Sequence, residues 1–363
     1  MLYFIFYLFI LQFIPCVTRM NIEIIDAKER NIFLHLTADA YPVFFTQAYH
    51  EFEHSNGYET GFITEDHKVW MPFRIYKKLI FNFIQIMYPP LLAGERLTVA
   101  AEKKFLNACI EQLKKEKKYH RIIQPFVWDV FHTVPDSATY CPFGQLYTTL
   151  SDKTEEEIFN QFSPKYRNAI RKVLLNSDLV ICKTNTTELQ AFYDTYREVH
   201  EKQQVYFDSY SHFNHMQRAL SNKHFMLMNL YYNNSLEGGA VITYTKKEAN
   251  YLYGGAKNPT LQNGSIKLLQ FEIIKQLKAV GVQKYIWGGC RLSDVTGTKQ
   301  QGMQEFKMRF GCQIKKGFLW KIDLNKSYCL LYDTMIALQH RMQGKKFKGD
   351  VIDYEKNRAV IIP

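Results

Sequence analysis

The sequence has no pair of cysteines at C-x-x-C spacing, although seven cysteines are spread over the chain. Their odd number and wide separation argue against both a zinc site and a disulfide framework. We therefore expect reduced thiols and a cytoplasmic location. Cys290, which follows Gly288 and Gly289, is the one cysteine whose setting makes it a candidate nucleophile.

The sequence also lacks the motifs that identify several large enzyme classes. It contains no G-x-x-x-x-G-K-S/T phosphate loop, no H-E-x-x-H zinc motif and no G-x-S-x-G nucleophile motif. His212 and His215 are three residues apart, but no third ligand accompanies them. We predict no metal site and no tightly bound cofactor.

What is present indicates a globular protein of two domains. The chain has 363 residues, of which 47% are apolar and 22% are charged, which is enough to bury two cores. The formal net charge of +11 favours an anionic partner, such as a phosphate, a nucleic acid or an acidic lipid surface.

The first 19 residues differ from the rest of the chain. Residues 2–14 are apolar apart from Gln12. This run is shorter than the roughly 20 residues that an ordinary membrane-spanning helix needs, and it lacks the positive start of a signal peptide. We interpret residues 1–19 as an apolar leader or an over-extended gene start, with a hydrophobic anchor or a weak signal as the alternatives.

Hydrophobic periodicity predicts a mixed α+β fold. In the second half, a meander of three strands (225–232, 240–245 and 251–253) is followed by a helix (264–280) and a strand (284–287). That order is the skeleton of an acetyltransferase-type fold, and the first half has a looser version of it. We therefore expect two similar lobes, each a mixed, mostly antiparallel sheet flanked by helices.

A basic cluster lies in the helix predicted after Pro164. Arg167 and Arg171 are four residues apart, so they share one face of that helix, and Lys165 and Lys172 flank them. Because a guanidinium can donate two hydrogen bonds at once, this face is suited to phosphate. The alternative is an ordinary solvated helix face.

A second cluster spans residues 304–311. Phe306 and Phe310 are four residues apart and predict a buried stripe on one face of a helix. Lys307 follows Phe306 directly and lies outside that stripe. A lysine held next to buried aromatic residues can stabilise negative charge that develops in a reaction. The alternative is an ordinary surface lysine.

The third segment is Tyr253-Gly254-Gly255, at the end of the last meander strand. Two glycines allow a ligand to approach the backbone closely, whereas the alternative is a plain glycine turn. The next helix begins near Gly264, and a helix start can hold a phosphate. The R/Q-x-x-G-x-G/A motif that grips coenzyme A in many acetyltransferases is not matched by residues 262–267.

These segments, in this order, resemble the FemAB family of the GNAT superfamily over about residues 140–320. The strongest match is Trp287-Gly288-Gly289, followed by Gly302 and then by Phe306-Lys307-x-x-Phe310-Gly311. The basic helix at residues 165–172 and the glycines of residues 238–240 and 253–255 add to the resemblance.

The resemblance implies two tandem GNAT-like lobes, at residues 20–140 and 141–343, with the active site in the second lobe and a basic tail at 344–363. It implies that Lys307 stabilises the oxyanion. It also implies transfer of an aminoacyl or acyl group to an amine of a cell-envelope precursor, such as a peptidoglycan precursor. The substrate-binding residues that we predict are Lys165, Arg167, Arg171, Tyr253, Gly254, Gly255, Gly288, Gly289 and Phe306.

Two donors remain open, aminoacyl-tRNA and an acyl-coenzyme A thioester. A coenzyme A-dependent N-acetyltransferase of surface polysaccharide or lipid synthesis is therefore the first alternative. The second is a non-enzymatic protein that binds RNA or a membrane surface through its basic charge. Peripheral membrane contact is compatible with each of these interpretations.

Overall fold

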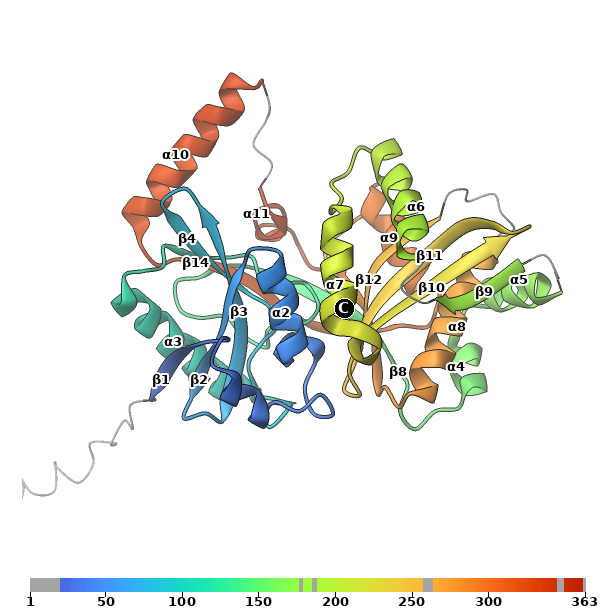
Figure 1. Ribbon diagram of the computed structural model, residues 1–363. Coiled ribbons are helices and arrows are strands. Elements are labelled where there is room, and N and C mark those ends of the chain that lie inside the picture. The colour runs from blue at the N-terminus through green and yellow to red at the C-terminus, as the bar shows by residue number, and fades with distance from the viewer. Residues whose placement is uncertain (1–19, 176–178, 185–187, 257–263, 345–348, 362–363) are drawn as a thin grey trace, which may run out of the picture.

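The computed structural model describes residues 20–175, 179–184, 188–256, 264–344 and 349–361; the predicted leader lies outside this part. Two lobes lie side by side, each a sheet with helices on its faces (Figure 1). The strands run in the order β1-β2-β3-β4-β7-β14-β8-β13-β12-β11-β10-β9. The predicted α+β fold is confirmed, with one difference: β14 joins the sheets of the two lobes into one.

The first-lobe sheet is buried on both faces. Phe62 and Ile63 are neighbours on β2 and belong to different cores, because successive strand residues point to opposite faces. α3 covers the Ile63 face with Phe105 and Leu113, and α2 packs on the Phe62 face. The elements are β1 (Ile22–Asp26), η1 (Arg30–His35), η2 (Val43–Phe45), α2 (Gln47–Ser55), β2 (Glu59–Glu65), β3 (Val69–Lys78), β4 (Phe81–Ile86), β5 (Leu91–Leu92), β6 (Glu95–Arg96), α3 (Val99–Glu116) and β7 (Arg121–Ile123).

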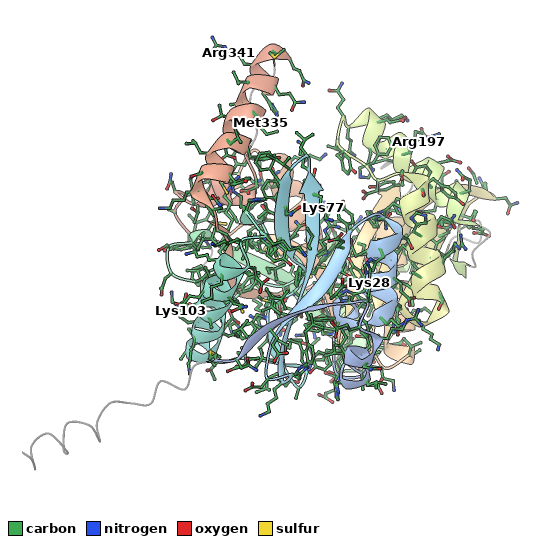
Figure 2. The ribbon with its side chains drawn as sticks, turned by 60° about the vertical axis from the view of Figure 1, so that its left-hand side comes forward. Lys28, Lys77, Lys103, Arg197, Met335 and Arg341 are labelled. Atoms are coloured by element: carbon green, nitrogen blue, oxygen red, sulfur yellow. The ribbon has the colours of Figure 1, made fainter. Side chains whose placement is uncertain are left out.

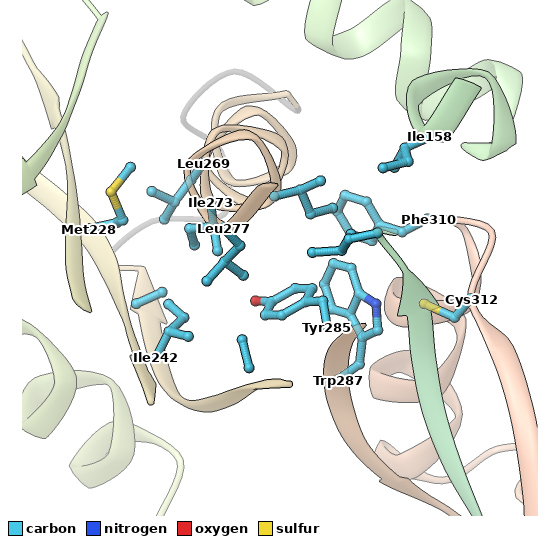
Figure 3. Packing of buried hydrophobic residues seen from close by; sticks show 14 of the residues in the cluster. Ile158, Met228, Ile242, Leu269, Ile273, Leu277, Tyr285, Trp287, Phe310 and Cys312 are labelled. Atoms are coloured by element: carbon cyan, nitrogen blue, oxygen red, sulfur yellow. The ribbon is translucent and has the colours of Figure 1, made fainter. Parts of the chain in front are cut away.

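The second lobe follows the same plan. On β10, Met226 and Met228 face the core under α4, α5 and α8, whereas Phe225 and Leu227 face α6 and α7. Figure 3 shows the first of these cores, where α8 packs over Tyr285 and Trp287 of β13. The elements are β8 (Thr139–Thr149), α4 (Glu155–Gln161), α5 (Pro164–Leu174), β9 (Leu179–Thr184), α6 (Leu189–Lys202), α7 (Tyr210–His224), β10 (Phe225–Tyr232), β11 (Ser235–Tyr244), β12 (Ala249–Ala256), α8 (Ser265–Ala279), β13 (Lys284–Cys290), α9 (Lys299–Met308) and β14 (Gln313–Asp323).

The chain returns to the first lobe after β14. Most of β14 pairs with β8, but Ile322 and Asp323 pair with β7. α10 (Lys326–Met342) then packs on β4, where the Tyr332 ring lies 4.7 Å from that of Phe83. The lobes also share one core, in which aromatic residues around α2 meet α7 and β10.

Two segments show how local contacts fix the chain. The 3-10 turn η2 and the helix α2 are separated by Thr46, which is extended and caps α2 by accepting a hydrogen bond from Tyr49 N at 3.3 Å. In the basic tail, α11 (Val351–Glu355) packs on the second lobe. Its Ile352 is buried, and Glu355 pairs with Arg291 at 3.2 Å.

Candidate active site

A cavity lies where two neighbouring strands of the second lobe separate. β12 and β13 pair in parallel only at Ala249–Tyr285 and Asn250–Ile286. Beyond Ile286, β13 continues along β8 with a bulge before Gly288. The cavity has a volume of about 460 Å³ and takes residues from both strands, α6, α9 and the segment before β8. Its lining is Val127, Trp128, Tyr196, His200, Tyr251, Leu252, Tyr253, Gly254, Trp287, Gly288, Gly289 and Lys307.

Lys307 reaches this cavity from the last turn of α9. A Cβ atom built on Gly288 would lie 3.5 Å from the Lys307 Nζ, so the amine lies against the glycine backbone. Burial lowers the pKa of Lys307 below its ordinary 10.5. Among the described residues, no carboxylate forms an ion pair with it. The cavity therefore holds a desolvated cation with no protein anion to neutralise it.

Two glycines of β13 line the cavity beside this lysine. Gly288 has a φ of +98°, a backbone conformation that L side chains rarely adopt. A Cβ on Gly289 would collide with the Phe143 ring. The backbone conformation therefore favours glycine at position 288, and the Phe143 ring leaves no room for a side chain at position 289.

Cys290 does not have the environment of a nucleophile. It is 2% exposed, it is absent from the cavity lining, and burial raises the pKa of its thiol to about 12. The thiolate that a nucleophile needs is therefore scarce at neutral pH. The idea that Cys290 is a nucleophile is wrong for this conformation.

A polar network holds Tyr253, which lines the same cavity. The Tyr253 hydroxyl donates to Asp208 Oδ2 at 3.1 Å and lies 2.9 Å from His212 Nε2. Burial, and then the Asp208 charge, raises the pKa of Tyr253 well above its usual range. Tyr253 therefore remains a neutral phenol that is held in one orientation.

His200 supplies a basic nitrogen to the cavity wall. Its Nδ1 lies 2.8 Å from the carbonyl oxygen of Tyr196. Because a carbonyl only accepts hydrogen bonds, Nδ1 carries the proton and Nε2 is left with the lone pair. Sequence reasoning missed His200, Tyr196 and Trp128, which no motif marks.

The structure brings together five of the predicted site residues in this cavity: Lys307, Tyr253, Gly254, Gly288 and Gly289. The other five lie outside its lining. Gly255 faces the backbone of α6, and Phe306 packs between Tyr166 and Phe310. Lys165, Arg167 and Arg171 are on α5, which packs against α8.

The Arg167 guanidinium is already engaged by the protein. It donates to the carbonyl oxygens of Asn160 and Phe162, at the C-terminal end of α4. Carbonyls at a helix end lack partners within the helix, so this arginine acts as a cap. We expect Arg167→Ala to lower the free energy of unfolding by about 1–3 kcal/mol, measured by chemical denaturation.

Arg171→Ala is the matched control on the same helix. Within the described ranges its guanidinium makes one long hydrogen bond, 3.4 Å to Asn168, and it packs over the Phe159 ring. We expect the control to change stability by less than about 1 kcal/mol. Unchanged stability of Arg167→Ala with weakened donor binding would instead support the phosphate role first predicted.

A cluster of cations borders the start of α8. The Lys267 ammonium lies 5.0 Å from the centre of the Tyr166 ring. Partial burial, and then the neighbouring charges of Lys165 and Arg309, lowers the pKa of Lys267. Lys165 therefore belongs to a basic cluster, but with partners from α8 and α9 that the sequence did not indicate.

No group of His, Cys, Asp or Glu side chains that could hold a metal ion occurs within the described ranges. His212 is engaged with Tyr253, and the His215 Nδ1 lies 3.4 Å from Asn56 Oδ1.

The separating strands and the meander define an acyltransferase fold of the GNAT type. Comparison with known families and with curated proteins finds no match to this sequence, but solved structures share its fold. FemX matches with a TM-score of 0.65 at 14% identity, over 86% of this chain and 99% of FemX. The FemAB-like fold that the sequence resemblance implied is thereby confirmed.

Two further structures have the same fold. L-PGS from Bacillus licheniformis has a TM-score of 0.52 at 11% identity, over 81% of this chain and 92% of its own. The C-terminal domain of a putative lysylphosphatidylglycerol synthetase from Agrobacterium fabrum has a TM-score of 0.50 at 11% identity. The match covers 86% of this chain and 96% of that domain.

Proposed function

We propose that this protein is an acyltransferase that moves an aminoacyl or acyl group from an activated donor to an amine of a cell-envelope precursor. The observation that carries the proposal is the Lys307 ammonium, which has no acidic partner in the described part of the chain and lies against Gly288 in the cavity. Such a cation stabilises an oxyanion more strongly than it would in water, because the site is desolvated.

In the proposed reaction, the acceptor amine attacks the carbonyl carbon of the donor ester or thioester. A C–N bond forms, and the carbonyl oxygen becomes an oxyanion beside Lys307. The His200 Nε2 takes the proton that the amine loses. The C–O or C–S bond then breaks, and the leaving hydroxyl or thiol takes up a proton. No metal is needed for any of these steps.

Lys165, Lys267 and Arg309 are the residues that we assign to the donor phosphates. They lie by the start of α8, and the dipole at a helix start favours an anion. Aminoacyl-tRNA and acyl-coenzyme A both carry phosphates, so this cluster supports an anionic donor without choosing between them. The fold shared with FemX and with a protein named for lysylphosphatidylglycerol makes an aminoacyl donor the first to test.

The test compares the melting temperature of the protein with aminoacyl-tRNA, uncharged tRNA and acyl-coenzyme A thioesters. A ligand that binds only the folded state raises the melting temperature by mass action. We expect a rise with an aminoacyl donor, and transfer of its labelled amino acid to an amine acceptor.

Each alternative has its own outcome in the same experiment. A rise with thioesters alone, accompanied by acyl transfer, would identify the coenzyme A-dependent N-acetyltransferase. Salt-sensitive binding of charged and uncharged RNA alike, with no transfer from any donor, would reject the enzyme proposal in favour of an RNA-binding protein.

A further inference from the structure

α10 presents a broad apolar face that no described part of the chain covers. The helix stands out from the first lobe in Figure 1; in Figure 2, Arg341 marks its projecting end and Met335 its middle. Five large apolar side chains of this helix are between 40% and 88% exposed. They are Leu330, Leu331, Met335, Leu338 and Met342. At helical spacing, Leu331, Met335, Leu338 and Met342 form one stripe.

The apolar stripe of α10 carries no acidic residue. The one acidic residue of the helix, Asp333, lies on the side opposite the stripe, where it is 53% exposed and pairs with Arg121 at 2.7 Å. Lys326 and Arg341 stand near the two ends of the helix, and neither forms an ion pair within the described ranges. The stripe is therefore apolar, with a cation near each end of the helix.

A second apolar element borders this helix. Leu79 and Ile80, at the tip of the β3–β4 hairpin, are 79% and 64% exposed. The next residue, Phe81, has its ring 5.1 Å from that of Tyr332 in α10. The Lys78 ammonium lies 5.6 Å from the centre of the same Tyr332 ring. The hairpin tip thus extends the apolar surface and adds another cation to it.

We propose that α10 and the Leu79–Ile80 tip dock on the surface of an anionic lipid bilayer. A helix with an apolar face and bordering cations lies in the plane of the interface, with its apolar side chains among the acyl chains. The cations then face lipid phosphates. No helix in the described ranges is long and apolar enough to cross a membrane, so docking, not spanning, is the mode that fits.

A second copy of the chain is a poorer occupant. The stripe covers only about two heptads, whereas stable coiled coils generally need three or four. A second α10 would also bring its own Lys326 and Arg341, whereas its one carboxylate, Asp333, lies on the side opposite the stripe and is paired with Arg121. An anionic bilayer supplies the charge that a second copy lacks.

The experiment uses the full chain and two kinds of vesicle, one of pure phosphatidylcholine and one with an equal amount of phosphatidylglycerol. We expect binding to the anionic vesicles and weakening of that binding by salt. The double variant Leu331→Glu, Leu338→Glu should reduce the bound fraction at least about tenfold, because two apolar contacts are lost and two like charges are added.

Leu34→Glu is the control, since Leu34 is 76% exposed in η1, in the early part of the first lobe. It should bind as the unaltered protein does, and all three proteins should melt at similar temperatures. Equal binding to both vesicles, or unreduced binding of the double variant, would overturn the proposal. The proposal would also be overturned if the protein formed a dimer in lipid-free solution and the double variant were a monomer. The apolar face would then be an interface between two copies of the chain.

Discussion

Lys307→Met should lower kcat about 10²–10³-fold while leaving donor binding nearly intact. A cation that meets charge only in the transition state affects turnover more than ground-state affinity. Methionine has a similar length, and replacing a buried ammonium removes an unfavourable desolvation, so stability should not fall. Steady-state kinetics of acyl transfer, with the melting temperature measured in parallel, test this prediction.

Lys299→Met, on the same helix, is the matched control. The Lys299 amine donates a hydrogen bond to Gln203 Oε1 at 2.7 Å, and Lys299 does not line the cavity. The control should retain the kcat of the unaltered enzyme. A kcat for Lys307→Met within about threefold of that value would remove Lys307 from the mechanism.

The same lysine predicts a pH dependence. The protonated amine is the form that stabilises an oxyanion, and burial lowers its pKa below 10.5. Turnover should therefore fall on the alkaline side at a lower pH than an ordinary lysine would dictate. The residual activity of Lys307→Met should lack that alkaline limb.

Asp129→Asn should lower the free energy of unfolding by about 3–5 kcal/mol, because it breaks a buried charge network. Asp129 is 2% exposed and lies between the lobes, 2.7 Å from Arg96 Nη1 and 2.8 Å from Lys315 Nζ. Arg96 still pairs with Glu102, at 2.8 Å, but Lys315 loses the one carboxylate that it contacts among the described residues. Chemical denaturation measures the change.

Asp136→Asn provides the comparison, since Asp136 pairs with Lys103 at 2.6 Å but is 72% exposed. It should cost less than about 1 kcal/mol, as exposed ion pairs usually do. Equal effects of the two substitutions would show that the buried network contributes no more than a surface pair.

The Asp129 network should also make the free energy of unfolding depend on pH in the acid range. Burial alone would raise the pKa of Asp129, but Arg96 and Lys315 outweigh burial and lower the pKa to about 2, from an ordinary 3.8. Its contribution is therefore present above about pH 4 and is lost as the pH falls towards 2. The unaltered protein should lose about 2 kcal/mol more than Asp129→Asn over that range.

Features that depend on a few adjacent residues could be predicted from the sequence. The helix predicted after Pro164 is α5, and Pro164 lies in its first turn. Alternating apolar residues indicated the β10–β11–β12 meander and the long helix after it. These signals are local because a cap or a strand face involves residues close in the chain.

Other features of the site were decided by the tertiary structure. The sequence placed Arg167 on a phosphate-binding face, but the chain folds the end of α4 against that guanidinium and uses it as a cap. Trp128 and His200 join Lys307 only because β12 and β13 part after two residue pairs.

The sequence by itself determined the local elements, the positions of the glycines and the place of Lys307 on its helix. The tertiary structure alone decided which cations gather at α8, that β14 joins the two lobes, and that α10 returns to the first lobe with its apolar face uncovered. The physical reason is that strand order follows from burying whole sheet faces, which is a property of the entire chain and not of any segment.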